Sequence, residues 1–180
     1  VQCGEFTYYL AQALADTVLG EGNYTVLEQM TGKDLEYKEY EPLFDCAVEI
    51  YAKQRKKAYY VVCDDYVTLS DGTGVVHIAP AFGEDDARIS RKYDLPFAQL
   101  VDAKGNMTAE TPFAGVFVKK ADPMVLKYLE EHGLLFSAPS FVHSYPHCWR
   151  CDTPLIYYAR ESRFIKMTAV KEDLIRNNNT

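Results

Sequence analysis

The stretch of sequence that determines the fold is residues 71–86, which read DGTGVVHIAPAFGEDD. The apolar run at 75–79 predicts a buried strand. Residues 83–86 then provide an acidic start for a helix predicted at 87–93, whose later basic residues complement the helix dipole. A strand is therefore expected to lead directly into a helix at this point.

The same stretch concentrates residue types that bind ligands. Alternation along the strand places His77 on one face with Val75 and Ala79, which leaves space for a pocket. A hydrogen-bonded core histidine is an equally good interpretation of His77. Asp85 and Asp86 follow at the helix start, where carboxylates are common simply because they stabilise the helix N-terminus. The spacing alone therefore indicates a site without identifying its ligand.

Two glycines in Gly72-Thr73-Gly74 allow close approach of the backbone to a neighbour. The segment lacks the Lys-Ser/Thr pair of a P-loop and the third glycine of a dinucleotide-binding fingerprint. Phosphate binding is therefore not expected there.

The rest of the chain predicts a mixed α/β fold with many short strands. Helices are expected at 6–19, at 122–132 and from about residue 170 onward. A hairpin is expected from strands at 24–30 and 35–44. Further strands are predicted at 58–63, 66–69, 97–101, 116–118, 141–145 and 155–158. Because strands and helices do not alternate regularly, a mixed barrel or sheet is favoured over a doubly wound fold.

Composition limits the classes of function. The 180 residues include 19 Lys plus Arg against 26 Asp plus Glu, a net charge of −7 that excludes a basic field over the whole chain. RNA contact would have to be local, and such basic runs are more often solvated surfaces. The two candidate clusters are Lys53, Arg55, Lys56 and Lys57, and Arg88, Arg91 and Lys92.

The five cysteines are odd in number and mostly scattered, which is typical of a protein in the reducing cytoplasm. No apolar run reaches membrane-spanning length, so no membrane partner is expected. The N-terminus, VQCGE, reads as the interior of a longer protein. We therefore expect residues 1–180 to be one excised domain.

Taken together, residues 72–86 (GTGVVHIAPAFGEDD) closely resemble a motif in the editing domain of isoleucyl-tRNA synthetases. In the valyl and leucyl relatives, Lys or Met replaces the histidine and a Pro-Ala-His segment occupies the bend. Further agreement comes from YEPLF at 40–44 and SYPHCWRCDTPLIY at 144–157. The resemblance spans nearly the whole chain and is strongest from Gly72 onward.

The resemblance implies the β-barrel with peripheral helices of the valyl, isoleucyl and leucyl editing domains, inserted in a class I synthetase. It implies an aminoacyl-tRNA ester hydrolase that removes valine misattached to isoleucine tRNA, and it leaves valyl-adenylate open as a second substrate. An apolar synthetic pocket cannot strongly reject a substrate one methylene smaller, so a second, smaller pocket destroys the error; isoleucyl enzymes are the standard case of this double sieve. Residues 144–167 would return the chain to the catalytic body.

The resemblance also assigns roles within the site. Asp86 should hold the α-ammonium of valine through charge-assisted hydrogen bonds, and His77 should line the pocket near the amino acid and terminal ribose. A positioned water and oxyanion donors can then supply catalysis without a covalent nucleophile. The remaining substrate-binding residues implied are Gly72, Thr73, Gly74, Ala79, Pro80, Phe82, Gly83 and Asp85.

Parts of the parent enzyme are absent from this sequence. The His-x-Gly-His and Lys-Met-Ser-Lys-Ser signatures do not occur, so ATP and Mg²⁺ are expected to serve only the parent's catalytic domain, and editing itself is expected to need no cofactor. The family's threonine-rich pocket peptide, Thr-Thr-Thr-Pro-Trp-Thr, is also missing. The isolated chain is therefore expected to be weakly active or inactive.

Cys148-x-x-Cys151 is half of a tetrahedral zinc knuckle, because two intervening residues let both thiolates reach one ion. Some family members supply a second Cys-x-x-Cys from sequence that is not present here. A structural zinc half-site and a pair of unmetallated thiols remain equally open.

Two other functions stay possible at this point. One is a noncatalytic module that positions the tRNA acceptor end or completes a zinc-linked interface. The other is valyl-type editing of misattached threonine, against which His77 argues. The expected partners are the acceptor end of isoleucine tRNA carrying valine and the remainder of the parent synthetase.

Overall fold

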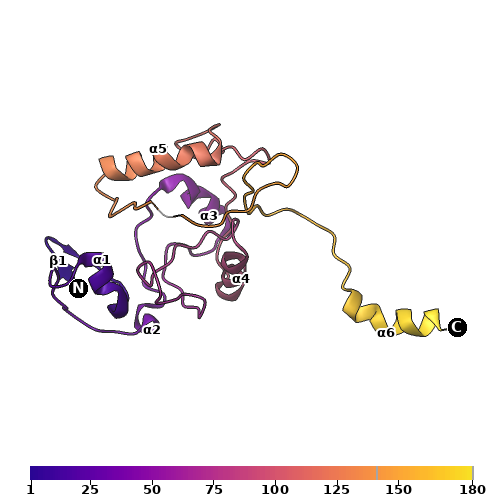
Figure 1. Cartoon of the computed structure of the whole chain (residues 1–180). Helices are drawn as coiled ribbons and strands as arrows, with labels where there is room; N and C mark the ends of the chain where they lie inside the picture. The colour runs from indigo at the N-terminus through magenta and orange to yellow at the C-terminus, as the bar shows by residue number, and fades with distance from the viewer. Residues whose placement is uncertain (141, 180) are drawn as a thin grey trace.

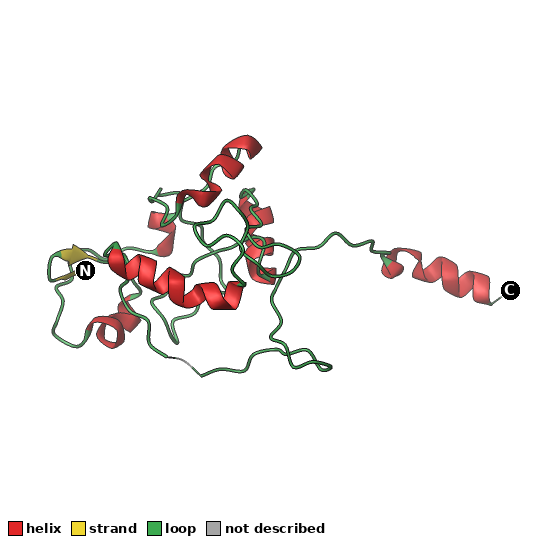
Figure 2. Cartoon of the chain, turned by 90° about the horizontal axis from the view of Figure 1, so that it is seen from above, coloured by secondary structure: helices red, strands yellow, loops and turns green. Residues whose placement is uncertain are grey.

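Helices provide most of the regular secondary structure in the computed structural model, which describes residues 1–140 and 142–179 (Figures 1 and 2). The elements in chain order are strands β1 (Gln2–Cys3) and β2 (Phe6–Thr7), the 3-10 helix η1 (Gln12–Leu14), helices α1 (Ala15–Leu19) and α2 (Gly32–Leu35), the 3-10 helix η2 (Asp45–Ala47), and helices α3 (Val48–Gln54), α4 (Glu84–Tyr93), α5 (Val118–Glu131) and α6 (Met167–Asn178).

The two strands form one antiparallel ribbon with Gln2 opposite Thr7 and Cys3 opposite Phe6. Other pairings in the described residues are isolated bridges: Gln2 with Thr25, Glu39 with Tyr60, Val101 with Met107, Asn106 with Phe117 and His147 with Pro154. The mixed α/β class is confirmed. A two-stranded sheet is not closed, so a barrel is not observed in this part of the chain.

The N-terminal predictions were partly wrong. The helix predicted at 6–19 starts at Gln12, because residues 6–7 pair with β1 across a turn in which Gly4 has a φ of +60°. The hairpin predicted at 24–30 and 35–44 does not form. Its turn is instead the short helix α2, where Thr31 and Asp34 make a capping box. The segment after α2 bonds to residues 59–61, as in the 2.8 Å bond from Tyr37 N to Val61 O.

The other predicted strands were also wrong within the described residues. No strand is assigned at 58–63, 66–69, 75–79, 97–101, 116–118, 142–145 or 155–158, while residue 141 lies outside the described residues. Strand-forming side chains need a partner ladder, and these segments make at most single bridges. Segment 75–79 lies at the surface, with Val75 59% exposed. Helix α3 was not predicted.

The three longest helices confirm the helical predictions, although each begins earlier than expected. Helix α4 begins at Glu84 and includes the whole acidic cluster as its first turn. Helix α5 begins at Val118 and contains Pro123, and Gly133 follows its C-cap with a φ of +67°. None of the helices in the described residues combines the length and the apolarity needed to cross a membrane.

The buried core is small and is built from short segments. The accessible surface is 14202 Å², against roughly 8900 Å² for a compact monomer of this mass. Ile89 on α4 is the largest fully buried side chain among the described residues. Helix α6 projects away from everything else at the end of an extended segment (Figures 1 and 2). The best-anchored helix is therefore α4, which carries the candidate site.

Candidate functional site

A cavity of about 440 Å³ lies at the N-terminal end of α4. Its walls come from the segment before α4, from residue 66 and from residue 157 in the predicted return segment. The lining residues are Tyr66, Val76, His77, Phe82, Gly83, Glu84, Asp85, Asp86 and Tyr157. Parts of the chain far apart in sequence thus meet at the helix start.

A tight turn delivers the chain to α4. Phe82 N–H donates to Ala79 O at 2.9 Å, and Pro80 at the second position of this turn has the fixed φ that such turns favour. Gly83 is the N-cap of α4 in an extended conformation. A Cβ at Gly83 would overlap the carboxylate of Asp86, so the absence of a side chain there lets Asp86 fold back over the helix start.

Asp86 is a half-buried carboxylate. Burial raises its pKa above the usual Asp value of 3.8, and the like charge of Asp85 raises it further. The nearby His77 and a backbone hydrogen bond from Ala79 act in the opposite direction. This combination, with no ion pair to Asp86 recorded in the described residues, leaves the carboxylate suited to binding a cation.

The adjacent Asp85 has a different environment. Its Oδ1 lies 3.1 Å from Nη2 of Arg88, one turn along α4. The same guanidinium binds Asp64 at 2.8 Å. Two neighbouring carboxylates in the first turn are therefore distinguished by their partners, because Asp85 is neutralised by Arg88 and Asp86 faces His77.

The structure brings half of the sequence-predicted site residues into the cavity: His77, Phe82, Gly83, Asp85 and Asp86. His77 is exposed and reaches it from an irregular segment, so the predicted strand alternation is not what places it there. Ala79 does not line the cavity but contributes its backbone to Asp86. Pro80 shapes the turn but does not line the cavity.

The predicted residues Gly72, Thr73 and Gly74 lie outside the cavity lining. Thr73 O accepts a 2.8 Å hydrogen bond from Ala11 N–H. Gly74 has a φ of +75°, and a Cβ there would overlap Ala11, so its packing against the N-terminal region accounts for the glycine. This segment positions the chain that precedes His77.

Sequence reasoning missed two aromatic residues of the cavity, Tyr66 and Tyr157. The hydroxyl of Tyr66 is buried and has no hydrogen-bond partner among the described residues. Burial raises the pKa of Tyr66, and Asp86 raises it further. Tyr157 is within the stretch that carries the family resemblance, but no spacing connects either tyrosine to residues 72–86. Only the tertiary contacts reveal them.

The Cys148–Cys151 segment forms a tight turn. Cys148 N–H donates to Thr153 O at 2.9 Å, and Asp152 N–H donates to Cys148 O at 2.8 Å. A hydrogen bond with Thr153 lowers the pKa of the Cys151 thiol, with a second contribution from Cys148. Across residues 1–140 and 142–179, no group of three or more metal-binding side chains converges. The zinc half-site at Cys148 and Cys151 therefore stays a prediction.

The basic clusters are partly neutralised. Lys56 pairs with Asp94 at 2.5 Å and Lys57 with Glu39 at 2.5 Å. In the second cluster, Arg88 and Lys92 both bind Asp64. Much of the basic charge predicted to be available for RNA is therefore already paired.

Comparison with known proteins shows that the chain corresponds to a segment of larger enzymes. No family model matches it. It is 54% identical over 171 residues to isoleucine–tRNA ligase of Clostridium acetobutylicum, and 52% identical to that of Clostridium novyi, in both cases over 94% of this chain. It is 46% identical over 98% of its length to isoleucine–tRNA ligase of Thermus thermophilus.

These similarities confirm the resemblance to isoleucyl-tRNA synthetases. The chain spans about one sixth of each relative, 16% of its length. It therefore corresponds to one part of such a synthetase.

Proposed function

We propose that this chain is the editing domain of an isoleucyl-tRNA synthetase and hydrolyses the ester of valine misattached to isoleucine tRNA. The observation that carries the proposal is the half-buried Asp86 carboxylate beside His77 in a cavity of about 440 Å³. The relatives' names support the synthetase, and the cavity supports a binding site for a small amino acid.

Asp86 binds the α-ammonium of the valyl group, because a desolvated carboxylate gains most from a cationic partner. Charge attraction and the fixed helix start then orient the ester for attack by water. Phe82, Tyr66 and Tyr157 restrict the space around the side chain, and His77 lies near the amino acid and the ribose. The remainder of the synthetase and the tRNA acceptor end are the partners, and ATP and Mg²⁺ serve only the parent's catalytic domain.

We also propose that the strand-like segments of this chain pair into a barrel within the whole synthetase. Exposed Val75 and Val76, and the single bridges at Tyr60, Val101 and Phe117, are what unpaired strand segments present. Cytoplasmic localisation is part of the same proposal, as is activity that depends on segments outside this chain.

The test uses the full-length parent synthetase. Asp86→Ala should lower the rate of valyl-tRNA deacylation by about a hundredfold or more, because the ammonium loses its charged partner. Isoleucine charging should continue, and valyl-tRNA should accumulate. Asp86→Glu serves as the matched variant that keeps the charge but moves it.

The outcomes separate the alternatives. An unchanged deacylation rate in Asp86→Ala would contradict the anchor role and favour a noncatalytic module, for which the Cys148–Cys151 turn is the supporting observation. Faster removal of threonine than of valine by the unmodified enzyme would indicate valyl-type editing instead.

A further inference from the structure

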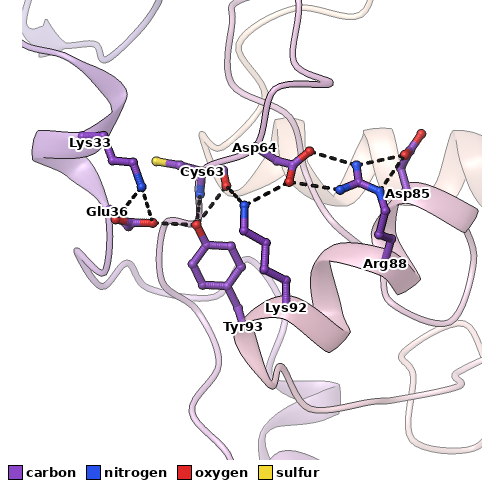
Figure 3. Close-up of polar contacts among 8 residues, drawn as sticks. All are labelled: Lys33, Glu36, Cys63, Asp64, Asp85, Arg88, Lys92 and Tyr93. Carbon is purple, nitrogen blue, oxygen red and sulfur yellow. Dashed lines mark hydrogen bonds and ion pairs between the residues drawn. The ribbon is translucent and has the colours of Figure 1, made fainter.

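A network of ion pairs and hydrogen bonds joins α4 to the segment before the cavity wall (Figure 3). Arg88 binds Asp64 through two bonds, Nη1 to Oδ2 at 3.1 Å and Nη2 to Oδ1 at 2.8 Å. Lys92 adds a 3.2 Å contact with Asp64 and a 3.1 Å bond to Cys63 O. Tyr93 donates to Glu36 at 2.5 Å and accepts from Cys63 N–H at 3.1 Å.

The Arg88–Asp64 pair connects two walls of the cavity. Asp64 is two residues before Tyr66, which lines one wall, and Arg88 is two residues after Asp86, which lines the other. A planar guanidinium that makes two parallel bonds fixes orientation as well as distance. The side chain of Asp64 is only 11% exposed, so water competes little for it.

Arg88 also forms an ion pair with Asp85 in the first turn of α4. The titratable groups that line the cavity with Asp86 are Glu84 and Asp85 on its own helix, His77 from the preceding segment, and Tyr66 and Tyr157. Arg88 contacts Asp85 Oδ1 through Nη2 at 3.1 Å and Nε at 3.4 Å. Asp85, the like charge that raises the pKa of Asp86, therefore has its own cation.

We propose that Arg88 and Asp64 are positioning residues for editing: their paired bonds hold the start of α4 against the wall that carries Tyr66, and Arg88 neutralises Asp85, so that Asp86 presents the binding carboxylate. The inference rests on the proposed function, since it concerns how Asp86 is set up to bind the substrate ammonium.

The proposal has a signature in the pH dependence. Asp85 raises the pKa of Asp86 even with Arg88 in contact with it, so removal of Arg88 should strengthen the repulsion between the two carboxylates. Editing requires ionised Asp86, so its rate falls as the pH drops through the pKa of Asp86. Loss of Arg88 should therefore move this acid limb to higher pH.

The experiment measures valyl-tRNA deacylation by the full-length synthetase against pH. Arg88→Ala should reduce kcat/KM by about tenfold to a hundredfold, because small displacements of a positioned group are costly. It should also shift the acid limb upward. Adding Asp85→Asn should return the acid limb toward its original position. Arg176→Ala is the matched control: it removes an exposed arginine that is ion-paired with Asp173 on α6, outside both candidate RNA clusters, and it should change neither quantity.

Equal behaviour of Arg88→Ala and Arg176→Ala would overturn the positioning role, while loss of editing in Asp86→Ala would still support the proposed function. Retention of editing in Asp86→Ala would instead remove the proposed function itself. If Arg88→Ala also lost isoleucine charging, Asp64→Asn would decide: it keeps the shape of the side chain, and an unaltered kcat/KM would contradict the proposal.

Discussion

Helices α4 and α6 are similar in length but have opposite surroundings. Helix α4 has ten residues, buries Ile89 completely and is tied to the segment at 63–64 by Arg88 and Lys92. Helix α6 has twelve residues, buries none of them and projects on an extended segment (Figure 1). Local sequence is sufficient to specify a helix, whereas a binding site needs a helix that is also held in place by contacts with other segments of the chain.

The largest expected difference between these helices is in how much each contributes to the free energy of unfolding. Ile89→Ala should lower the free energy of unfolding of the chain by about 2–5 kcal/mol, because it leaves a cavity in the core. Ile175→Ala on α6, where the side chain is 46% exposed, should change it by less than about 0.5 kcal/mol. Denaturant unfolding of both variants measures the difference. Equal losses would show that α6 is packed as well as α4.

A smaller effect concerns the fit between Gly83 and Asp86. Gly83→Ala should displace the carboxylate and reduce valyl-tRNA deacylation by about tenfold in the full-length synthetase, because the new Cβ overlaps the Asp86 side chain. Gly32→Ala is the matched control, since its Cβ would meet only Cys63 Sγ at 3.9 Å. Normal editing by Gly83→Ala would show that Asp86 can bind the ammonium from a second position.

The smallest expected effect is a change in pH dependence. Burial raises the pKa of Asp86 above 3.8, so the acid limb of deacylation should lie above that pH. The electrostatic interaction with His77 lowers the pKa of Asp86, so His77→Gln should move the limb slightly upward. A pH–rate profile of the two enzymes measures the shift. A shift of the acid limb to lower pH in His77→Gln would contradict this account of the interaction between His77 and Asp86.

The contrast between the helices also explains what the sequence could predict. Helix α4 was expected because the acidic residues at its start and the basic residues at its end stabilise a helix locally. The prediction differed only in placing the first three residues, 84–86, before the helix. The strands were not predictable in the same way, since Val75 and Val76 have strand-forming side chains but no neighbouring ladder.

The residues of the candidate site likewise fall into those that the local sequence predicts and those that only the tertiary structure brings in. His77 and Asp86 were identified from one continuous stretch, and the cavity brings them together. Tyr66 and Tyr157 reach the cavity only through the path of the chain in space, which no spacing of residues encodes. The difference in surroundings between Asp85 and Asp86 depends on Arg88, which also binds Asp64, and no spacing of residues in the sequence predicts that contact.

The overlap between a side chain at position 83 and the Asp86 carboxylate has an evolutionary consequence. If Asp86 binds the substrate ammonium as proposed, a shorter residue at 86 would not compensate for a larger one at 83, because it would remove the binding carboxylate. Under the same proposal, position 83 should remain a small residue for as long as the enzyme edits. A bulky residue at this position in a related synthetase would then predict weakened editing.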